Sequence, residues 1–471
     1  MLCLSLVLLL ASAEDNDWSR FRGPNGTGVA DAAGLPAEIG ATKNVVWKTV
    51  LPPGYSSPAV SGDRVFVTAY EGDTLLTIAL DRATGKEVWR RPSPRDRQEK
   101  LDKRNGPASP TPVADGKNVY VFFGDYGLVS YDFAGGERWR TPLGPFNNIY
   151  GIGASPVLVE DKVVLVCDQN RGSFAAAFRQ SDGREVWRIP RPEALSGHST
   201  PIVYAPPGGP VQVIAPGSFR MDSYAAANGE SVWWVNGLPG EMKSGPVLLE
   251  DTVYVNGFST PENDAGRQVV VPPFAEVLAK HDANKDGKIS EAEAPDERTR
   301  TYFVFSDLDE DGSLDAAEWR IWAASSASEN GLLAFRAGGH GDLTGKSLLW
   351  RYSRSVPQLP TTVVYLGVVY MINDGGILTT FDARTGEVRK QGRLRGAIDN
   401  YFASPVAGDG KVYIVSRSGT VVVLKAGGEQ EVLSVGELDD EVYATPALAG
   451  GRIYLRTRGA LYCFGRGQAL K

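Results

Sequence analysis

The sequence predicts an all-β fold, an eight-bladed β-propeller, on three observations. A start made of a small residue and a proline, followed by alternating apolar residues, recurs along the chain. A second pattern, a glycine turn before a strand that bears tryptophan, follows most of these starts. The prolines of the first five starts stand at positions 58, 110, 156, 201 and 246, so one unit is about 45 to 50 residues long. Units of this length with four strands each are typical of propeller blades.

Eight copies of the start supply the first two strands of each predicted blade. They begin at Ser56, Ala108, Ala154, Ser199, Ser244, Thr361, Ala403 and Ala444. Within each copy, Val, Ile, Tyr and Phe alternate with polar residues on both sides of a short turn, which is the pattern of a β-hairpin. The second pattern, for example LDRATGKEVW from Leu80, adds two more strands. Each unit is therefore expected to form one four-stranded sheet.

The ring is expected to close through the N-terminal part of the chain. The eighth unit has no tryptophan strand after LYCFG at Leu461, whereas the unpaired segment NVVWKTV, residues 44–50, carries Trp47 at the equivalent place. Pairing these two segments would leave no open sheet edge. We expect the tryptophans of the repeats to pack between blades and to donate their N–H to a backbone carbonyl. These residues are Trp47, Trp89, Trp139, Trp187, Trp233 and Trp350.

An insertion interrupts the fifth blade. From Pro246 to the equivalent Thr362 there are 116 residues, where about 45 would complete a unit. Long additions are tolerated best on surface loops. The sequence therefore predicts a small α-helical insertion at residues 259–330. The propeller is then made of residues 44–258, with the closing strand and blades 1 to 5, and residues 331–471, with the remainder of blade 5 and blades 6 to 8.

The insertion carries two tandem matches to the pattern D-x-[DN]-x-[DN]-G-x5-E, which predicts an EF-hand pair. Calcium is a hard cation that takes six to eight oxygen ligands, and the six loop positions of this pattern supply them. The expected ligands of the first loop are Asp282, Asn284, Asp286, Lys288, Ser290 and Glu293. Those of the second loop are Asp307, Asp309, Asp311, Ser313, Asp315 and Glu318. We therefore expect two calcium ions as cofactors.

The two loops are expected to be coupled and to differ in affinity. Ile289 and Leu314 occupy loop position eight, where apolar residues of paired loops face each other in a short strand pair. The second loop offers five carboxylates and the first offers three. Because ligand charge tunes calcium affinity, the sequence predicts that the second loop binds more tightly. The alternative is that both loops are merely solvated acidic turns.

The N-terminus predicts export. Residues 1–13 contain an apolar run that ends in Ala-Ser-Ala, which is typical of a signal peptide, and residues 14–43 form an N-terminal segment before the propeller. A buried N-terminal strand is the alternative. The expected location is therefore periplasmic or extracellular, and no other stretch is long and apolar enough to be a transmembrane segment. Only Cys167 and Cys463 follow the leader, so no disulfide framework is indicated. The net charge of -7, without basic runs, argues against nucleic acid as a partner.

With these motifs, the chain resembles the pyrroloquinoline-quinone-type β-propeller repeat proteins, with an inserted EF-hand pair. The repeated A-x-x-TG-x-x-x-W and [ST]P-V patterns carry this resemblance from WSRFRGPNGTG at Trp18 to LYCFG. It implies one of two functions. Members similar to the propeller of the outer-membrane assembly machinery are non-catalytic scaffolds that bind protein segments. Quinoprotein dehydrogenases are oxidoreductases that hold the quinone (PQQ) and a calcium at the propeller axis, with an Asp base.

The scaffold function is the one that the sequence favours. Alcohol-oxidising quinoproteins stack the quinone on a vicinal disulfide, and this chain has no Cys-Cys pair. With three His residues in all, no Ser-His-Asp or Cys-His arrangement can be argued, so no catalytic residue is assigned and no quinone-binding residue can be named. The expected function is a calcium-binding, exported propeller that acts as a non-catalytic binding module. The weaker alternative is a PQQ-dependent oxidoreductase.

A ligand surface is expected where the blades connect. The linkers from the outer strand of one blade to the inner strand of the next all emerge around one mouth of the channel. Polar and aromatic residues of these linkers would suit a protein segment or a saccharide, although any one of them could instead cap a turn. The expected ligand ring is Asn105, Asn148, Tyr150, His198, Lys243, Gln358, Asn400, Tyr401 and Tyr443.

Overall fold

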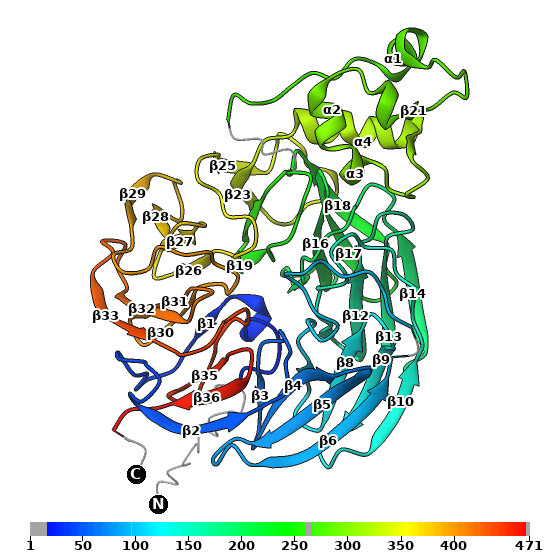
Figure 1. Cartoon of the computed structure of the whole chain (residues 1–471). Coiled ribbons are helices and arrows are strands. Elements are labelled where there is room, and N and C mark those ends of the chain that lie inside the picture. The colour runs from blue at the N-terminus through cyan, green and yellow to red at the C-terminus, as the bar shows by residue number, and fades with distance from the viewer. Residues whose placement is uncertain (1–16, 96, 260–264, 468–471) are drawn as a thin grey trace, which may run out of the picture.

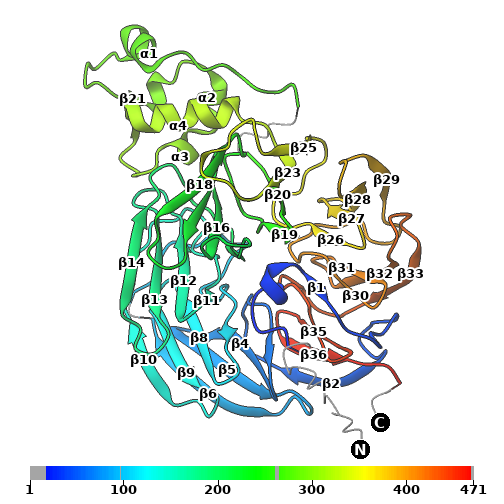
Figure 2. The same cartoon turned by 180° about the vertical axis from the view of Figure 1, so that it is seen from behind.

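Eight antiparallel β-sheets stand around a central channel in the computed structural model, which describes residues 17–95, 97–259 and 265–467 (Figure 1). The predicted eight-bladed propeller is therefore confirmed. In each blade the innermost strand is short and the sheet continues outward through the next three strands. Seen from behind, the blades follow one another around the ring in chain order, and the helices of the described chain gather beyond one edge (Figure 2).

The first four blades contain the following strands. Blade 1 consists of β3 (Ala59–Ser61), β4 (Arg64–Glu71), β5 (Thr74–Asp81) and β6 (Glu87–Pro94). Blade 2 consists of β7 (Val113–Ala114), β8 (Asn118–Phe123), β9 (Gly127–Asp132) and β10 (Glu137–Thr141). Blade 3 consists of β11 (Val157–Val159), β12 (Lys162–Cys167), β13 (Phe174–Arg179) and β14 (Glu185–Pro190). Blade 4 consists of β15 (Ile202–Tyr204), β16 (Gln212–Gly217), β17 (Arg220–Ala225) and β18 (Ser231–Asn236), with β24 (Gly341–Asp342) added in parallel to β18.

The other four blades complete the ring. Blade 5 consists of β19 (Val247–Leu249), β20 (Thr252–Gly257), β23 (Gly331–Arg336) and β25 (Leu348–Tyr352). Blade 6 consists of β26 (Val363–Tyr365), β27 (Val368–Ile372), β28 (Ile377–Asp382) and β29 (Val388–Arg393). Blade 7 consists of β30 (Val406–Gly408), β31 (Lys411–Val415), β32 (Thr420–Lys425) and β33 (Val432–Glu437). Blade 8 consists of β34 (Ala447–Ala449), β35 (Arg452–Arg456), β36 (Ala460–Phe464) and β2 (Val45–Val50).

The N-terminal strand closes the ring as predicted. Strand β2 pairs antiparallel with β36, and Trp47 lies opposite Cys463. The two ends of the propeller are thus held in one sheet, and the last blade has no missing outer strand. Trp47 is 6% exposed and belongs to the largest apolar cluster, which joins blades 7, 8 and 1.

The N-terminal segment crosses the middle of the ring before it reaches β2. It forms a 3-10 turn, η2 (Pro24–Gly26), and the short strand β1 (Val29–Ala30), which pairs parallel with β30 (Figure 1). Two buried arginines fix it to the inner strands. Arg20 donates to the carbonyl of Pro201 at 2.7 Å, and Arg22 donates to those of Thr362 at 2.8 Å and Pro405 at 3.1 Å. We call residues 18–28 the plug, because they contact inner strands on several sides of the channel.

The repeat tryptophans behave as expected, with one exception. Five of the six indoles donate to a backbone carbonyl of the following blade, for example Trp89 to Phe133 at 2.9 Å. Trp233 instead donates to the side-chain Oε1 of Gln212 in its own blade, at 2.8 Å. The connection of blade 5 differs here: β24 runs parallel beside β18, with Gly341 opposite Trp233.

All four α-helices of the described chain lie between β20 and β23 of blade 5. They are α1 (Phe274–His281), α2 (Glu297–Thr301), α3 (Phe303–Ser306) and α4 (Ala316–Ala327), accompanied by the 3-10 turn η3 (Glu291–Glu293). Two short strands, β21 (Ile289–Ser290) and β22 (Ser313–Leu314), pair antiparallel with Ile289 opposite Leu314. The helices and these two strands share a small apolar core of their own, which consists of Val277, Ile289, Phe303, Leu314, Trp319 and Trp322. We call residues 271–327 the helical insertion.

Three further predictions concern other parts of the chain. Cys167 and Cys463 are both free and buried. Among the described residues, no helix is both long and apolar enough to cross a membrane. The predicted signal peptide, residues 1–13, lies outside the described residues.

Candidate functional site: two acidic loops and the mouth of the channel

The second acidic loop, residues 307–318, turns its carboxylates inward. Asp307 accepts the backbone amides of Asp311 at 3.1 Å and Gly312 at 2.9 Å. At the end of the loop, Glu318 accepts the amides of Leu308 at 2.8 Å and Asp315 at 2.9 Å. Oxygen atoms of Asp307, Asp309 and Asp311 lie within 4.8 Å of one another, close enough to share one metal ion. The arrangement offers only oxygen ligands, which is the donor set that calcium prefers.

The first acidic loop, residues 282–293, repeats this network position by position. Asp282 accepts the amides of Asp286 at 3.2 Å and Gly287 at 3.0 Å, as Asp307 does in the second loop. Glu293 accepts those of Ala283 at 3.0 Å and Ser290 at 3.0 Å. Hydrogen bonds from the Ser290 hydroxyl and amide lower the pKa of Glu293 to about 2, so this carboxylate is ionised at neutral pH.

A propeller arginine enters the second loop. The Nη2 atom of Arg171, between β12 and β13, lies 3.0 Å from Asp309 Oδ2, 3.1 Å from Asp315 Oδ2 and 3.0 Å from Glu318 Oε1. Burial opposes ionisation of Asp315, but the Glu318 amide and Arg171 together lower its pKa. Three of the six expected ligand residues in this loop thus share one cationic nitrogen. The two additional carboxylates of this loop, Asp309 and Asp315, on which the expectation of tighter binding rests, therefore already have a counter-charge.

Other contacts hold the helical insertion beside the channel mouth. Lys100 pairs with Glu310 at 2.9 Å, and Arg320 pairs with Glu193 at 3.2 Å. A cavity between α3, α4 and the propeller is lined on the propeller side by Tyr150 and Glu241. Tyr150 also lines the pocket at the channel mouth, so the helical insertion and that pocket are neighbours.

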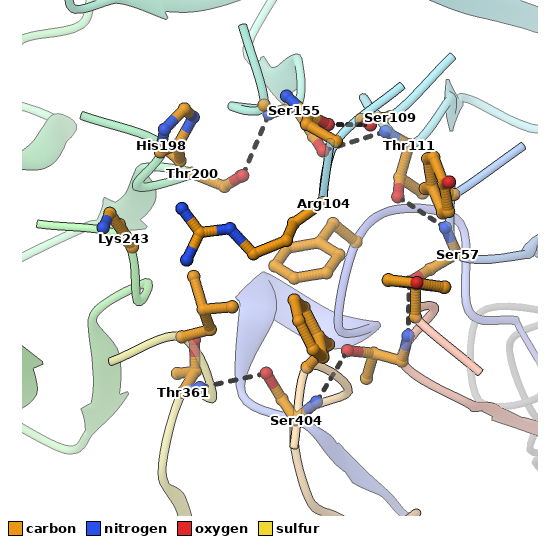
Figure 3. A pocket seen from close by; sticks show the side chains of 18 of the residues that line it. Ser57, Arg104, Ser109, Thr111, Ser155, His198, Thr200, Lys243, Thr361 and Ser404 are labelled. Atoms are coloured by element: carbon orange, nitrogen blue, oxygen red, sulfur yellow. Dashed lines mark hydrogen bonds between the residues drawn. The ribbon is translucent and has the colours of Figure 1, made fainter. Parts of the chain in front are cut away.

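At the inner wall of this pocket, seven Ser and Thr side chains occupy equivalent positions, each in a different blade (Figure 3). They are Ser57, Thr111, Ser155, Thr200, Thr361, Ser404 and Thr445. Each hydroxyl oxygen accepts the backbone amide of the equivalent residue in the preceding blade, at 2.8–3.0 Å. We call these seven residues the hydroxyl ring. The eighth equivalent residue is Gly245, which has no hydroxyl to accept the amide of Thr200.

Cationic side chains lie above the hydroxyl ring. Arg104 reaches into the middle of the pocket, with Lys243 and His198 to one side of it (Figure 3). The Nε and Nη2 atoms of Arg104 bind both carboxylate oxygens of Asp102, at 2.7 and 3.0 Å. Lys243 forms an ion pair with Glu241, and its Nζ lies 4.2 Å from the centroid of the Tyr150 ring. The nearby His198 is neutral, because burial and then Lys243 lower its pKa to about 3.

Aromatic side chains form the opposite wall. The ring centroids of Tyr55 and Tyr443 lie 4.5 Å apart, and those of Phe402 and Tyr443 lie 5.0 Å apart. Phe21 of the plug also lines the pocket. The cavity has a volume of about 200 Å³. Its walls combine apolar faces, hydroxyl groups and two cations, which is the mixed lining of a small-ligand or peptide site.

The structure brings six of the nine residues of the expected ligand ring into this pocket. They are Asn105, Tyr150, His198, Lys243, Gln358 and Tyr443. The other three lie outside it, which corrects the sequence prediction. Asn148 is buried and caps a turn, because it donates to Asp168 O at 2.8 Å and accepts the Tyr150 amide at 2.9 Å. Tyr401 is buried in the core and donates its hydroxyl to Ala397 O at 2.6 Å, and the neighbouring Asn400 accepts the Arg417 amide through its carbonyl.

Sequence reasoning missed the hydroxyl ring and Arg104. The signal for the hydroxyls was present, because six of the seven are a Ser or Thr that directly precedes a proline in a repeat start. That pattern served only to count blades. Arg104 stands directly before Asn105 in the same linker, but nothing in the sequence shows which of the two points to the axis. Phe21 could not be expected, since it reaches the pocket from the N-terminal segment.

The sequence matches the model of a known protein family along most of its length. A family model described as outer membrane protein assembly factor BamB matches residues 29–176, 76–260 and 171–468. The chain belongs to this family. The matched segments together cover all eight blades, so membership concerns the whole propeller and not one part of it. No curated protein matches the sequence.

Solved structures with the same fold include both functional classes. BamB from Moraxella catarrhalis has a TM-score of 0.56 at 12% identity, covering 89% of this chain and 99% of its own. A europium-containing methanol dehydrogenase has a TM-score of 0.60 at 10% identity, covering 96% and 98%. The quinohemoprotein alcohol dehydrogenase from Comamonas testosteroni has a TM-score of 0.59 at 11% identity, covering 98% and 82%. At these identities the likeness concerns the fold alone.

Proposed function

We propose that the chain is an exported, calcium-binding propeller that acts as a non-catalytic binding or scaffolding module. In this proposal the helical insertion is an EF-hand pair that binds two calcium ions, and the channel-mouth pocket binds a protein segment or a saccharide. The observation that carries the calcium part is the repetition of one inward carboxylate network in both acidic loops, joined by the pairing of Ile289 with Leu314.

The residues present fit calcium. In the first loop, Asp282, Asn284, Asp286 and Glu293 would supply side-chain oxygens, with the carbonyl of Lys288 and a ligand at Ser290 completing the shell. The second loop has the same donor types at the same spacing, ending with Glu318. Calcium would bind the carboxylate oxygens that both networks turn inward and would fix the two loops as one unit. Its role would be structural, since an exported protein meets constant calcium.

The lining of the pocket supports binding over quinone-dependent oxidation, the second candidate. A quinone site at the axis would need a nearby calcium with free carboxylate ligands. Among the described residues that line the pocket, Asp102 is the only carboxylate, and Arg104 engages both of its oxygens. The residues that line this pocket therefore do not fit the calcium that a quinone site would need. Family membership supports the binding role as well, because the family model carries the description of an outer membrane protein assembly factor.

Calorimetric titration of calcium into the chelator-stripped protein tests the first part. We expect two binding events in the native protein and none in a Glu293→Gln, Glu318→Gln double variant. The matched control is Glu291→Gln with Glu297→Gln, which removes two carboxylates of the same segment that are not expected ligands. Binding that persists in the first variant would place calcium elsewhere and would contradict the EF-hand proposal.

A dye-reduction assay tests the second part. The calcium-loaded protein is mixed with pyrroloquinoline quinone and an alcohol or a sugar, and reduction of an artificial electron acceptor is followed. We expect no turnover. Turnover that disappears in an Asp102→Asn variant would overturn the non-catalytic proposal and favour the oxidoreductase.

A further inference from the structure

The geometry of the hydroxyl ring points to a binding site for an oxyanion group, a carboxylate, sulfate or phosphate, at the blind end of the channel-mouth pocket. This inference rests on the proposed binding role of the pocket and names the chemistry of its ligand. A free ion and a larger ligand that carries such a group would be recognised in the same way, and the experiment below distinguishes the two. Three features of the pocket support this site: the direction of the hydroxyl protons, the unpaired cations below the ring and the closed floor.

The hydroxyl ring presents hydrogen-bond donors to the channel. A serine or threonine hydroxyl has one proton to donate and two lone pairs to accept with. In all seven residues the oxygen accepts a backbone amide, and no described residue accepts the hydroxyl proton. The seven side chains are at most 5% exposed and all line the pocket. An acceptor for the seven hydroxyl protons would therefore have to lie in the pocket.

Two of the four cations around the hydroxyl ring have no carboxylate partner in the described chain. Arg104 and Lys243 lie above the ring and are paired with Asp102 and Glu241. On the other side, Arg20 and Arg22 of the plug donate to Pro201, Thr362 and Pro405, the residues that directly follow three members of the ring. Arg20 is 7% exposed and Arg22 is 1% exposed, and neither forms an ion pair with a carboxylate of the described chain. Buried cations without a counter-ion are costly, so a nearby anion would offset them.

The floor of the pocket is closed. The plug crosses the channel one residue beyond the hydroxyl ring, and its Phe21 lines the pocket. A ligand can therefore enter from the mouth but cannot thread through. With hydroxyl donors at the end and aromatic walls at the mouth, the oxyanion group would enter first and the remainder of a larger ligand would lie against Tyr55, Phe402 and Tyr443.

Titration with sulfate at constant ionic strength, with chloride as the replaced ion, tests this site in the calcium-loaded protein. We expect saturable binding of one sulfate, which Lys243→Met weakens by roughly tenfold, because a charged partner is lost. Gly245→Ser is expected to strengthen binding, because it adds the eighth hydroxyl. A Cβ at Gly245 would meet only the Thr200 carbonyl at 3.5 Å and Thr361 Oγ1 at 3.8 Å, so the serine fits. The matched controls, Arg389→Met and Gly392→Ser on β29, should bind sulfate as the native protein does.

The outcomes separate this inference from the proposed function. Sulfate binding that does not saturate, or that is the same in all four variants, would be an effect of salt on the whole protein and would overturn the inference. Competition with sulfate by a short peptide with a free terminal carboxylate, but not by its amide, would assign the site to a group carried by a ligand. Sulfate binding without such competition would assign it to a free ion. Neither result depends on calcium titration or dye reduction, which test the proposed function.

Discussion

Arg171 of the propeller and Glu318 of the helical insertion form an ion pair, with Arg171 Nη2 3.0 Å from Glu318 Oε1. Glu318 ends the second acidic loop and is the expected bidentate calcium ligand, and the same nitrogen also contacts Asp309 and Asp315. A guanidinium and a calcium ion cannot share these oxygens without strong repulsion. Calcium binding to the second loop should therefore release Arg171 and weaken one of the contacts that hold the helical insertion on the propeller.

Replacing Arg171 should raise the calcium affinity of the second loop. In a Glu293→Gln background, which leaves only the second loop, Arg171→Met is expected to tighten binding by roughly tenfold or more, because calcium no longer displaces charge-assisted hydrogen bonds. Calorimetric titration measures this change. The control is Arg320→Met, which removes the ion pair with Glu193 but touches no loop carboxylate. Equal affinities in the two variants would show that Arg171 does not compete with calcium.

Completing the hydroxyl ring should stabilise the propeller. Gly245→Ser supplies an acceptor for the Thr200 amide and removes the backbone freedom of a glycine in the unfolded chain. We expect the free energy of unfolding to rise by about 1 kcal/mol, the usual contribution of one hydrogen bond. Urea denaturation in the absence of sulfate measures it. Gly245→Ala, which restricts the backbone without the hydroxyl, is the comparison, and an equal gain in both would assign the effect to the backbone alone.

The closing strand should carry a large part of the stability of the ring. Trp47 is 6% exposed and donates its indole N–H to the Arg82 carbonyl of blade 1 at 3.2 Å. Trp47→Ala is expected to lower the free energy of unfolding by about 3 to 5 kcal/mol, through lost burial and a cavity. The exposed neighbour Lys48 serves as the control in Lys48→Ala. A small effect at Trp47, measured by denaturant unfolding, would mean that the ring does not depend on this strand.

The pH dependence of stability should contain a contribution from His198. Burial, followed by Lys243, lowers its pKa from 6.5 to about 3 in the folded protein. Between these pH values the unfolded chain binds a proton at His198 that the folded chain does not. The contribution of His198 to the free energy of unfolding therefore falls as the pH drops from 6.5 towards 3. Unfolding measured across this range should therefore be less pH-dependent in His198→Gln than in the native protein. His340→Gln, in an exposed turn, should change nothing.

Much of the propeller could be predicted because its information is local and repeated. Each start encodes one hairpin by the alternation of apolar residues, and eight copies give the number of blades. Trp47 marked the closing strand, because it completes a pattern that the last blade lacks. Trp233 shows the limit of this reasoning. The hydrogen-bond partner of its indole depends on β24, a parallel strand that no local sequence pattern predicted.

The sequence by itself determined the number of blades, the closing strand and the identity of the acidic loop residues, because these follow from spacing along one stretch of chain. Only the tertiary structure decided which residues meet. It placed Arg171 in the second acidic loop, 147 positions before Glu318. It also brought one hydroxyl from each of seven blades, and Phe21 from the N-terminal segment, to the same pocket. The physical reason is that contacts across the ring join residues far apart in the chain, whereas a sequence pattern records only the neighbours of each residue.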